Sequence, residues 1–156
     1  GAENGVFRIG VPTQASPEWT CEQLCDEATG DVALGDVDGD GTAEMLAVQP
    51  FHGEKVCIKK LVGGAYTTVW RYGGQSKLGH VAWAGTLLGK PAFLFGFREG
   101  RGELVAVVWE NGAYKATKID AGISVANVCV VHEGEKEHIV LSNYNQGQAL
   151  LYTLTH

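Results

Sequence analysis

An internal repeat is the feature that most constrains how this chain folds. Val-Ala pairs begin at Val32, Val81 and Val125, so the copies are spaced 49 and 44 residues apart. A spacing of about 40–50 residues is typical of β-propeller blades. Each copy consists of short runs rich in β-branched, leucine and aromatic residues, which favour strands. The repeat therefore predicts an all-β protein built from similar antiparallel sheets.

Each copy has the strand plan of a meander. The predicted first, second and third strands are 31–37, 45–48 and 55–62, then 80–86, 92–97 and 103–110, then 124–130, 138–143 and 148–155. Fourth strands are predicted after Gly63-Gly64 and Asn111-Gly112, because such pairs are typical of two-residue hairpin turns. Four-stranded antiparallel blades of a β-propeller, about three in this chain, are the expected architecture.

The third copy ends before a fourth strand, whereas Glu3–Ile9 resembles 110–116, the start of the fourth strand of the second copy. The predicted division is an outer strand for a neighbouring blade (1–11), a link with a short helix (12–30), a blade with an acidic loop (31–73), a second blade (79–120) and an incomplete blade (123–156). Because three blades are too few to close a ring, we expect the ring to be completed from outside. A second copy, giving six blades, or the remainder of a longer polypeptide would complete it. A three-sheet sandwich or open prism is the alternative fold.

The predicted helix lies in the link, with Ser16 as its N-cap and Pro17 at its first position. The side chains of Cys21 and Cys25 would lie on the same face of this helix. The chain has four cysteines, too few for a disulfide framework. Packing onto the sheets is the expectation for this pair, and a disulfide or a functional thiol pair is the alternative.

A carboxylate-rich loop lies between the first two strands of the first copy. Aspartates stand at its first, third and fifth positions, a glycine permits the sharp turn, and a glutamate follows at the ninth. Ca²⁺ takes about 6–8 oxygen ligands. The predicted ligands are Asp36, Asp38, Asp40, the carbonyl of Thr42, Glu44 and a water. Aspartates that cap a turn without a metal are the alternative.

The same opening occurs in EF-hands, but these need a bidentate glutamate at position 12 and flanking helices. Here Ala47 stands at position 12 and strands flank the loop. A DxDGDGxxE loop between two strands resembles the FG-GAP/VCBS family of integrin-like calcium-binding β-propellers. The resemblance implies one Ca²⁺ and a module for ligand binding or scaffolding, with carbohydrate or protein recognition. We also expect an extracellular or cell-surface location.

A ligand site is expected on the face opposite the acidic loop, where the turns after the second strands gather. The candidate residues are His52, His80, Arg98, Tyr144 and Asn145. Aromatic rings beside a few polar groups are typical of ligand sites. The alternative is that the rings cover the core and the polar groups line solvated turns.

The charge and the motifs narrow the function classes. The net charge of -6 argues against nucleic acid or an anionic membrane as a partner, and no apolar run reaches the ~18 residues of a membrane span. No nucleophile elbow, phosphate loop or zinc-protease motif is present. A binding module is therefore expected rather than an enzyme. The alternative, by analogy of fold alone, is a polysaccharide lyase using His52 or His80 with Arg98, or another propeller enzyme with its site on the face opposite the acidic loop.

Overall fold

The computed structural model describes residues 3–155, which form strands and one short 3₁₀ helix, Tyr144–Gln146. The first sheet contains β3 (Val32–Gly35), β4 (Glu44–Gln49), β5 (Lys55–Val62) and β6 (Ala65–Arg71). The second contains β7 (Lys77–Leu87), β8 (Lys90–Glu99), β9 (Leu104–Glu110) and β10 (Ala113–Asp120). The third contains β11 (Val125–Glu133), β12 (Lys136–Asn143) and β13 (Gln148–Leu154). A separate N-terminal hairpin pairs β1 (Val6–Gly10) with β2 (Thr20–Cys25).

The all-β class and the four-stranded antiparallel meander are confirmed. In the first two sheets each strand pairs with the next along the chain, and the third sheet follows the same order with three strands. The turn between β9 and β10 shows the local cause, because Asn111 and Gly112 both have positive φ, at 53° and 76°. Two successive positive φ angles give the turn twist that suits a hairpin.

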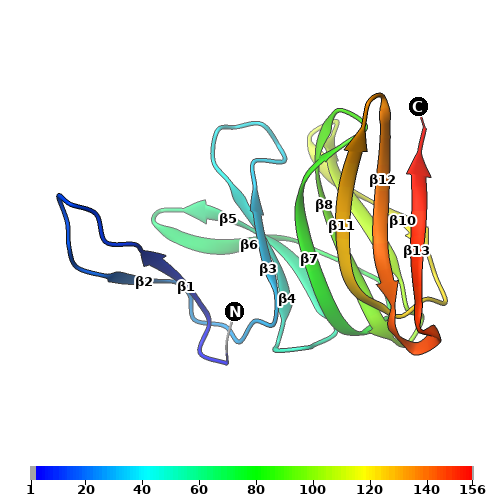
Figure 1. Cartoon of the computed structure of the whole chain (residues 1–156). Helices are drawn as coiled ribbons and strands as arrows, with labels where there is room; N and C mark the ends of the chain where they lie inside the picture. The colour runs from blue at the N-terminus through cyan, green and yellow to red at the C-terminus, as the bar shows by residue number, and fades with distance from the viewer. Residues whose placement is uncertain (1–2, 156) are drawn as a thin grey trace.

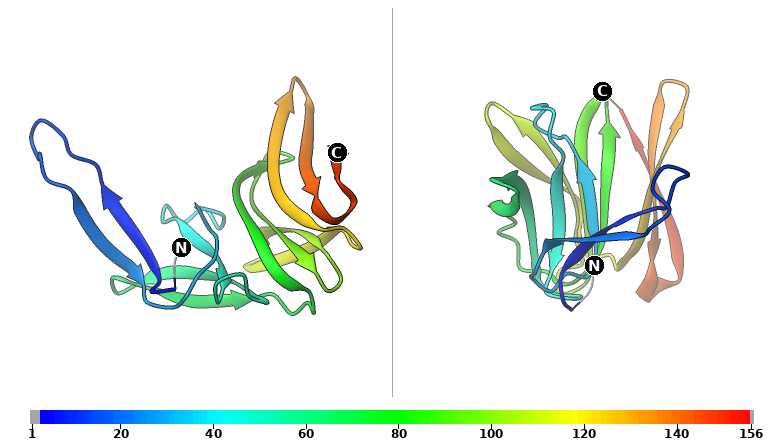
Figure 2. Two further views of the ribbon diagram at one scale, coloured as in Figure 1. Left: turned by 60° about the horizontal axis from the view of Figure 1, so that its bottom comes forward. Right: turned by 90° about the vertical axis from the view of Figure 1, so that its left-hand side faces the viewer.

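The sheets stack face to face, with the second sheet in the middle (Figure 2). Successive residues of a strand point to opposite faces, so β8 contributes to two cores. Phe93, Phe95 and Phe97 pack against the first sheet, whereas Ala92 and Leu94 pack against the third. All five side chains are fully buried. We call the face that a sheet turns towards the next sheet its front. The front of the first sheet thus packs on the back of the second, and the front of the second packs on the back of the third.

The first strands of the three sheets are neighbours, since β3 and β11 both contact β7 (Figure 1). This arrangement is an open series of sheets in which β13 has an unpaired outer edge among residues 3–155. The series is not closed within the described residues. A closed propeller ring remains a prediction.

The predicted helix in the link is wrong. Thr20–Cys25 is strand β2. Ser16 precedes this strand, and its carbonyl accepts a hydrogen bond from the Thr13 N–H (2.8 Å). Pairing with β1 satisfies the backbone groups of 20–25, so a partner that is distant in sequence overrides the local capping signal. Cys21 is exposed, Cys25 is buried, and neither is in a disulfide.

The N-terminal hairpin packs on the back of the first sheet at its base, through Val6, Leu24 and Cys25. Its tip points away from the three sheets (Figure 2). Phe7, Ile9 and Trp19 are 42%, 53% and 67% exposed, so the hairpin presents apolar side chains to solvent. No helix within residues 3–155 is long and apolar enough to cross a membrane.

Candidate metal centre and ligand face

The acidic loop joins β3 to β4 and is shaped by its own side chains. Asp36 Oδ2 accepts a hydrogen bond from the Gly41 N–H (2.9 Å), and Asp38 Oδ1 accepts one from the Asp40 N–H (3.2 Å). Asp40 Oδ1 in turn accepts from the Thr42 N–H (2.9 Å). Gly41 adopts a φ of 88°, which a residue with a side chain rarely adopts. These contacts turn the chain tightly and bring the carboxylates together.

Asp36, Asp38, Asp40 and Glu44 each place one carboxylate oxygen within 4.8 Å of the others. Glu44 is fully buried at the start of β4, and its Oε2 accepts the N–H groups of Val37 (2.8 Å) and Asp38 (3.3 Å). Burial raises the pKa of the Glu44 carboxyl. Its Oε1 and the Oδ1 of Asp36 are buried and accept no hydrogen bond from residues 3–155. Buried anionic oxygens without donors fit a cation, so the donor set suits Ca²⁺.

The structure adds a residue that sequence reasoning missed. Lys60 on β5 is ion-paired with Asp38 and with Asp40 (2.6 Å), and its Nζ lies 3.5 Å from Glu44 Oε1. Hydrogen bonds to the two aspartates raise the pKa of Lys60. Its ammonium offsets part of the negative charge and competes with a metal ion for the same oxygens. Only the pairing of β4 with β5 brings Lys60 to the loop, so no local pattern marks it.

The candidate ligand residues gather at the other end of the sheets. The rings of His52 and His80 are 5.2 Å apart, and the Arg98 guanidinium lies 3.9 Å from the centre of the Tyr144 ring. Burial lowers the pKa of His80, and the nearby Arg98 and His52 lower it further. Asn145 shares a cavity with Arg98. The two pairs are therefore neighbours, contributed by all three sheets.

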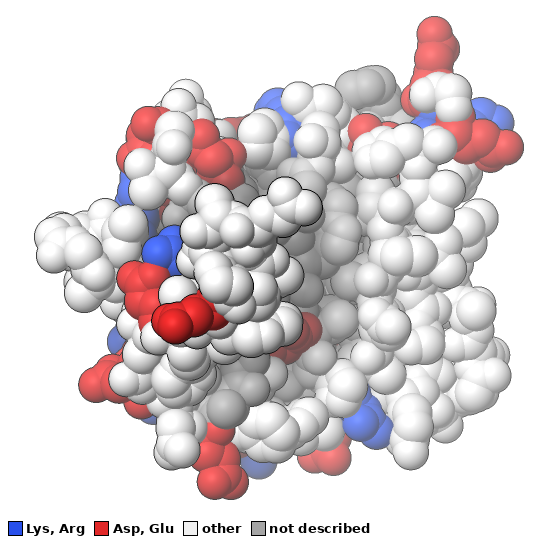
Figure 3. Space-filling view, turned by 60° about the vertical axis from the view of Figure 1, so that its left-hand side comes forward, with Lys and Arg blue, Asp and Glu red and all other residues white. Residues whose placement is uncertain are grey.

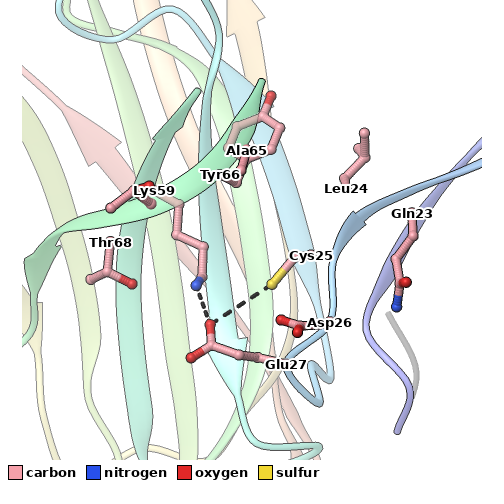
Figure 4. A pocket seen from close by; sticks show the side chains of 10 residues that line it. Gln23, Leu24, Cys25, Asp26, Glu27, Lys59, Ala65, Tyr66 and Thr68 are labelled. Atoms are coloured by element: carbon pink, nitrogen blue, oxygen red, sulfur yellow. Dashed lines mark hydrogen bonds and ion pairs between the residues drawn. The ribbon is translucent and has the colours of Figure 1, made fainter. Parts of the chain in front are cut away.

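The hairpin base forms a second polar cluster that the sequence did not reveal (Figure 4). A cavity of about 510 Å³ lies between β2 and β6, and the buried Lys59 points to it. Lys59 is ion-paired with Glu27, which also accepts a weak hydrogen bond from Cys25 (3.8 Å). The hydrogen bond from Lys59 lowers the pKa of Glu27. This pair ties the end of the hairpin to the first sheet.

Charged groups are unevenly spread over the surface. Figure 3 shows acidic side chains in several separate groups and few basic ones between large uncharged areas. That pattern agrees with the net charge of -6.

The sequence matches no protein-family model and shows no significant similarity to a curated protein. The resemblance to FG-GAP/VCBS propellers therefore rests on the acidic loop and the strand plan.

Proposed function

We propose that this chain is a calcium-stabilised β-propeller module of the FG-GAP/VCBS type that serves in ligand binding or scaffolding. The acidic loop carries the proposal, because the buried Asp36 Oδ1 and Glu44 Oε1 accept no hydrogen bond among the described residues. Lys60 Nζ lies 3.5 Å from the glutamate oxygen and balances only part of the charge of the cluster. The repeated front-to-back stacking of the sheets supports the propeller architecture. Carbohydrate or protein ligands would bind at the opposite end, near His80 and Arg98.

The proposed module is completed either by a second copy or by the remainder of a longer propeller chain. The open edge of β13 supports this part of the proposal, since soluble proteins rarely leave a long apolar edge unpaired. An extracellular or cell-surface location belongs to the same proposal.

An enzymatic role is the second candidate. Its support is the pairing of His52 with His80 beside Arg98, where burial and the nearby Arg98 lower the pKa of His80. A neutral histidine near neutral pH is suited to act as a general base. Incubation with anionic polysaccharides and detection of new unsaturated chain ends would test for lyase activity. His80→Gln is expected to abolish any such activity.

The Lys60→Met variant tests the metal proposal directly. Without metal, we expect it to unfold more easily by roughly 1 kcal/mol, because Asp38 and Asp40 lose their counter-charge. With saturating Ca²⁺, it should be at least as stable as the unaltered protein, because the ion no longer competes with the ammonium. Calorimetric titration should show severalfold tighter Ca²⁺ binding with one site per chain.

Lys55→Met is the matched control, since Lys55 is exposed on the same strand. It should change neither stability nor Ca²⁺ affinity. If Lys60→Met is destabilised equally in EDTA and in Ca²⁺, the lysine and not a metal balances the loop, and the metal proposal is wrong.

A further inference from the structure

A cavity of about 360 Å³ lies between the β8–β9 turn of the second sheet and the β12–β13 turn of the third. Cavities of about 300–1,000 Å³ are the usual size for small ligands. The polar side chains that line it include Arg98, Arg101, Ser124, Asn145 and Gln146. The cavity thus extends the candidate ligand face from His80 and Arg98 towards the third sheet.

The walls of the cavity are held by backbone hydrogen bonds. The Ile123 N–H donates to the Gly102 carbonyl (3.1 Å), and the Tyr144 N–H donates to the Ser124 carbonyl (2.8 Å). The Ser124 N–H is also bound, to Asn143 Oδ1 (2.9 Å). A Cβ on Gly102 would lie 1.9 Å from the Ile123 carbonyl oxygen, so the two segments meet as closely as a glycine allows. The site is therefore preformed.

The two arginines of the cavity, the half-buried Arg98 and the exposed Arg101, lack carboxylate partners among the described residues. Within residues 3–155, no carboxylate lies within 4.0 Å of a side-chain nitrogen of Arg98 or Arg101. This is notable in a chain with 18 acidic residues. Arg98 Nε and Ser124 Oγ are buried and have no hydrogen-bond partner in the same range. Ser124 as a whole is only 3% exposed.

The unpaired groups indicate the charge of the ligand. A guanidinium forms two parallel hydrogen bonds with a carboxylate, and such charge-assisted pairs are roughly twice as strong as neutral hydrogen bonds. The Arg98 guanidinium lies over the Tyr144 ring, 3.9 Å from its centre, and this cation–π contact holds the guanidinium in place. The amides of Asn145 and Gln146 supply neutral donors and acceptors beside it. Glu99 is the one acidic side chain in the described lining, so the two arginines leave a positive balance.

We propose that this cavity binds a small molecule through a carboxylate group, with Arg98 and Arg101 as the cationic contacts. The inference rests on the proposed ligand-binding role of this end of the molecule and names the chemical class of the ligand. A sugar acid and the carboxyl end of a peptide present the same group. The neutral part of either would lie against the amides of Asn145 and Gln146.

The test is an NMR titration of the isotope-labelled full chain with two pairs of probes and, separately, with inorganic phosphate. D-galacturonate and D-galactose represent the sugar source, and N-acetylglycine and its methylamide represent the peptide source. We expect the carboxylates to shift the backbone amides of Gly100, Gly102, Ser124 and Asn145, and the neutral probes to leave them unchanged. The acid that binds more tightly identifies the source.

Arg98→Gln and Arg101→Gln should each weaken carboxylate binding by roughly tenfold or more, because each removes a charge-assisted contact. Arg71→Gln is the control, since Arg71 lies at the end of β6 and outside this cavity. Binding should also weaken with added NaCl.

Three results would overturn the inference: shifts that map elsewhere or do not occur, equal binding of neutral and acidic probes, or tighter binding of inorganic phosphate than of either acid. The chemical shifts that locate the binding site are measured on the unaltered chain, so they test the inference even if a variant misfolds. Neutral probes bound in this cavity would overturn the carboxylate assignment and leave the proposed ligand-binding role intact. Failure of Ca²⁺ to bind would instead count against the proposed calcium module alone.

Discussion

Removal of Ca²⁺ with EDTA is expected to lower the melting temperature of this protein by roughly 5–10 °C. A ligand that binds only the folded state stabilises it by about 2.7 kcal/mol when present at 100 times its Kd. For a domain of this size, each kcal/mol corresponds to about 2–4 °C. Lys60 offsets only part of the repulsion among the four clustered carboxylates, so the metal-free loop should be the weak part of the first sheet.

Asp36→Asn should abolish the response to Ca²⁺. The amide oxygen of the substituted side chain can still accept the Gly41 N–H, so the turn keeps its hydrogen bond while the site loses a charge and a ligand oxygen. Asp38→Ala should have the same effect on Ca²⁺. Asp26→Asn, in an exposed position outside the loop, is the control.

Differential scanning calorimetry in EDTA, Ca²⁺ and Mg²⁺ measures these effects. Mg²⁺ should stabilise less, because it demands a regular octahedron of ligands and retains its waters. A melting temperature that is the same in EDTA and in Ca²⁺ would contradict the metal proposal.

The chain is also expected to self-associate, with a mass in sedimentation equilibrium of twice the 16.6 kDa of one chain. The outer face of the third sheet carries Val131 and Leu151, which are 46% and 64% exposed. The corresponding faces of the first two sheets form the cores between sheets. A further sheet is needed to cover this face. The back of the first sheet of a second copy would cover it, in the same way that the backs of the second and third sheets cover the sheets before them.

The open strand edges of β1 and β13 also support pairing between two copies of the chain. Within residues 3–155, β1 is paired only with β2, and β13 only with β12, so each has one open edge. In a two-fold assembly, β1 of each copy would join β13 of the other, and two interfaces would close a six-bladed ring. The exposed Phe7 and Ile9 would then be covered.

Two variants test this assembly. Leu151→Lys should give a folded monomer, because a charge is placed in the covered face. Deletion of residues 1–10 should destroy the dimer by removing the exchanged strand. Val62→Lys is the control, as Val62 is 59% exposed at the end of β5. A mass of 16.6 kDa for the unaltered chain at high concentration, with a folded β spectrum, would contradict both completion by a second copy and completion by a longer chain.

Much of the fold could be predicted because the signals are local. Alternating or continuous apolar runs marked the strands, and pairs such as Asn111-Gly112 marked the turns, since both depend on the backbone preferences of a few adjacent residues. The acidic loop was found for the same reason, because Asp36 to Glu44 form a cluster within nine consecutive residues. The prediction of a helix in the link was wrong because Ser16 and Pro17 favour a helix locally, whereas pairing with β1 makes Thr20–Cys25 a strand.

The sequence by itself thus determined the strands of the three sheets, their order and the position of the carboxylate cluster. Only the tertiary structure brought Lys60 to that cluster and left Arg98 and Arg101 without carboxylate partners among residues 3–155. It also showed which faces and edges are open. The physical reason is that strand formation and turn geometry depend on neighbours in the chain. Register between strands and stacking between sheets depend on side chains tens of residues apart, whose contacts no short pattern encodes.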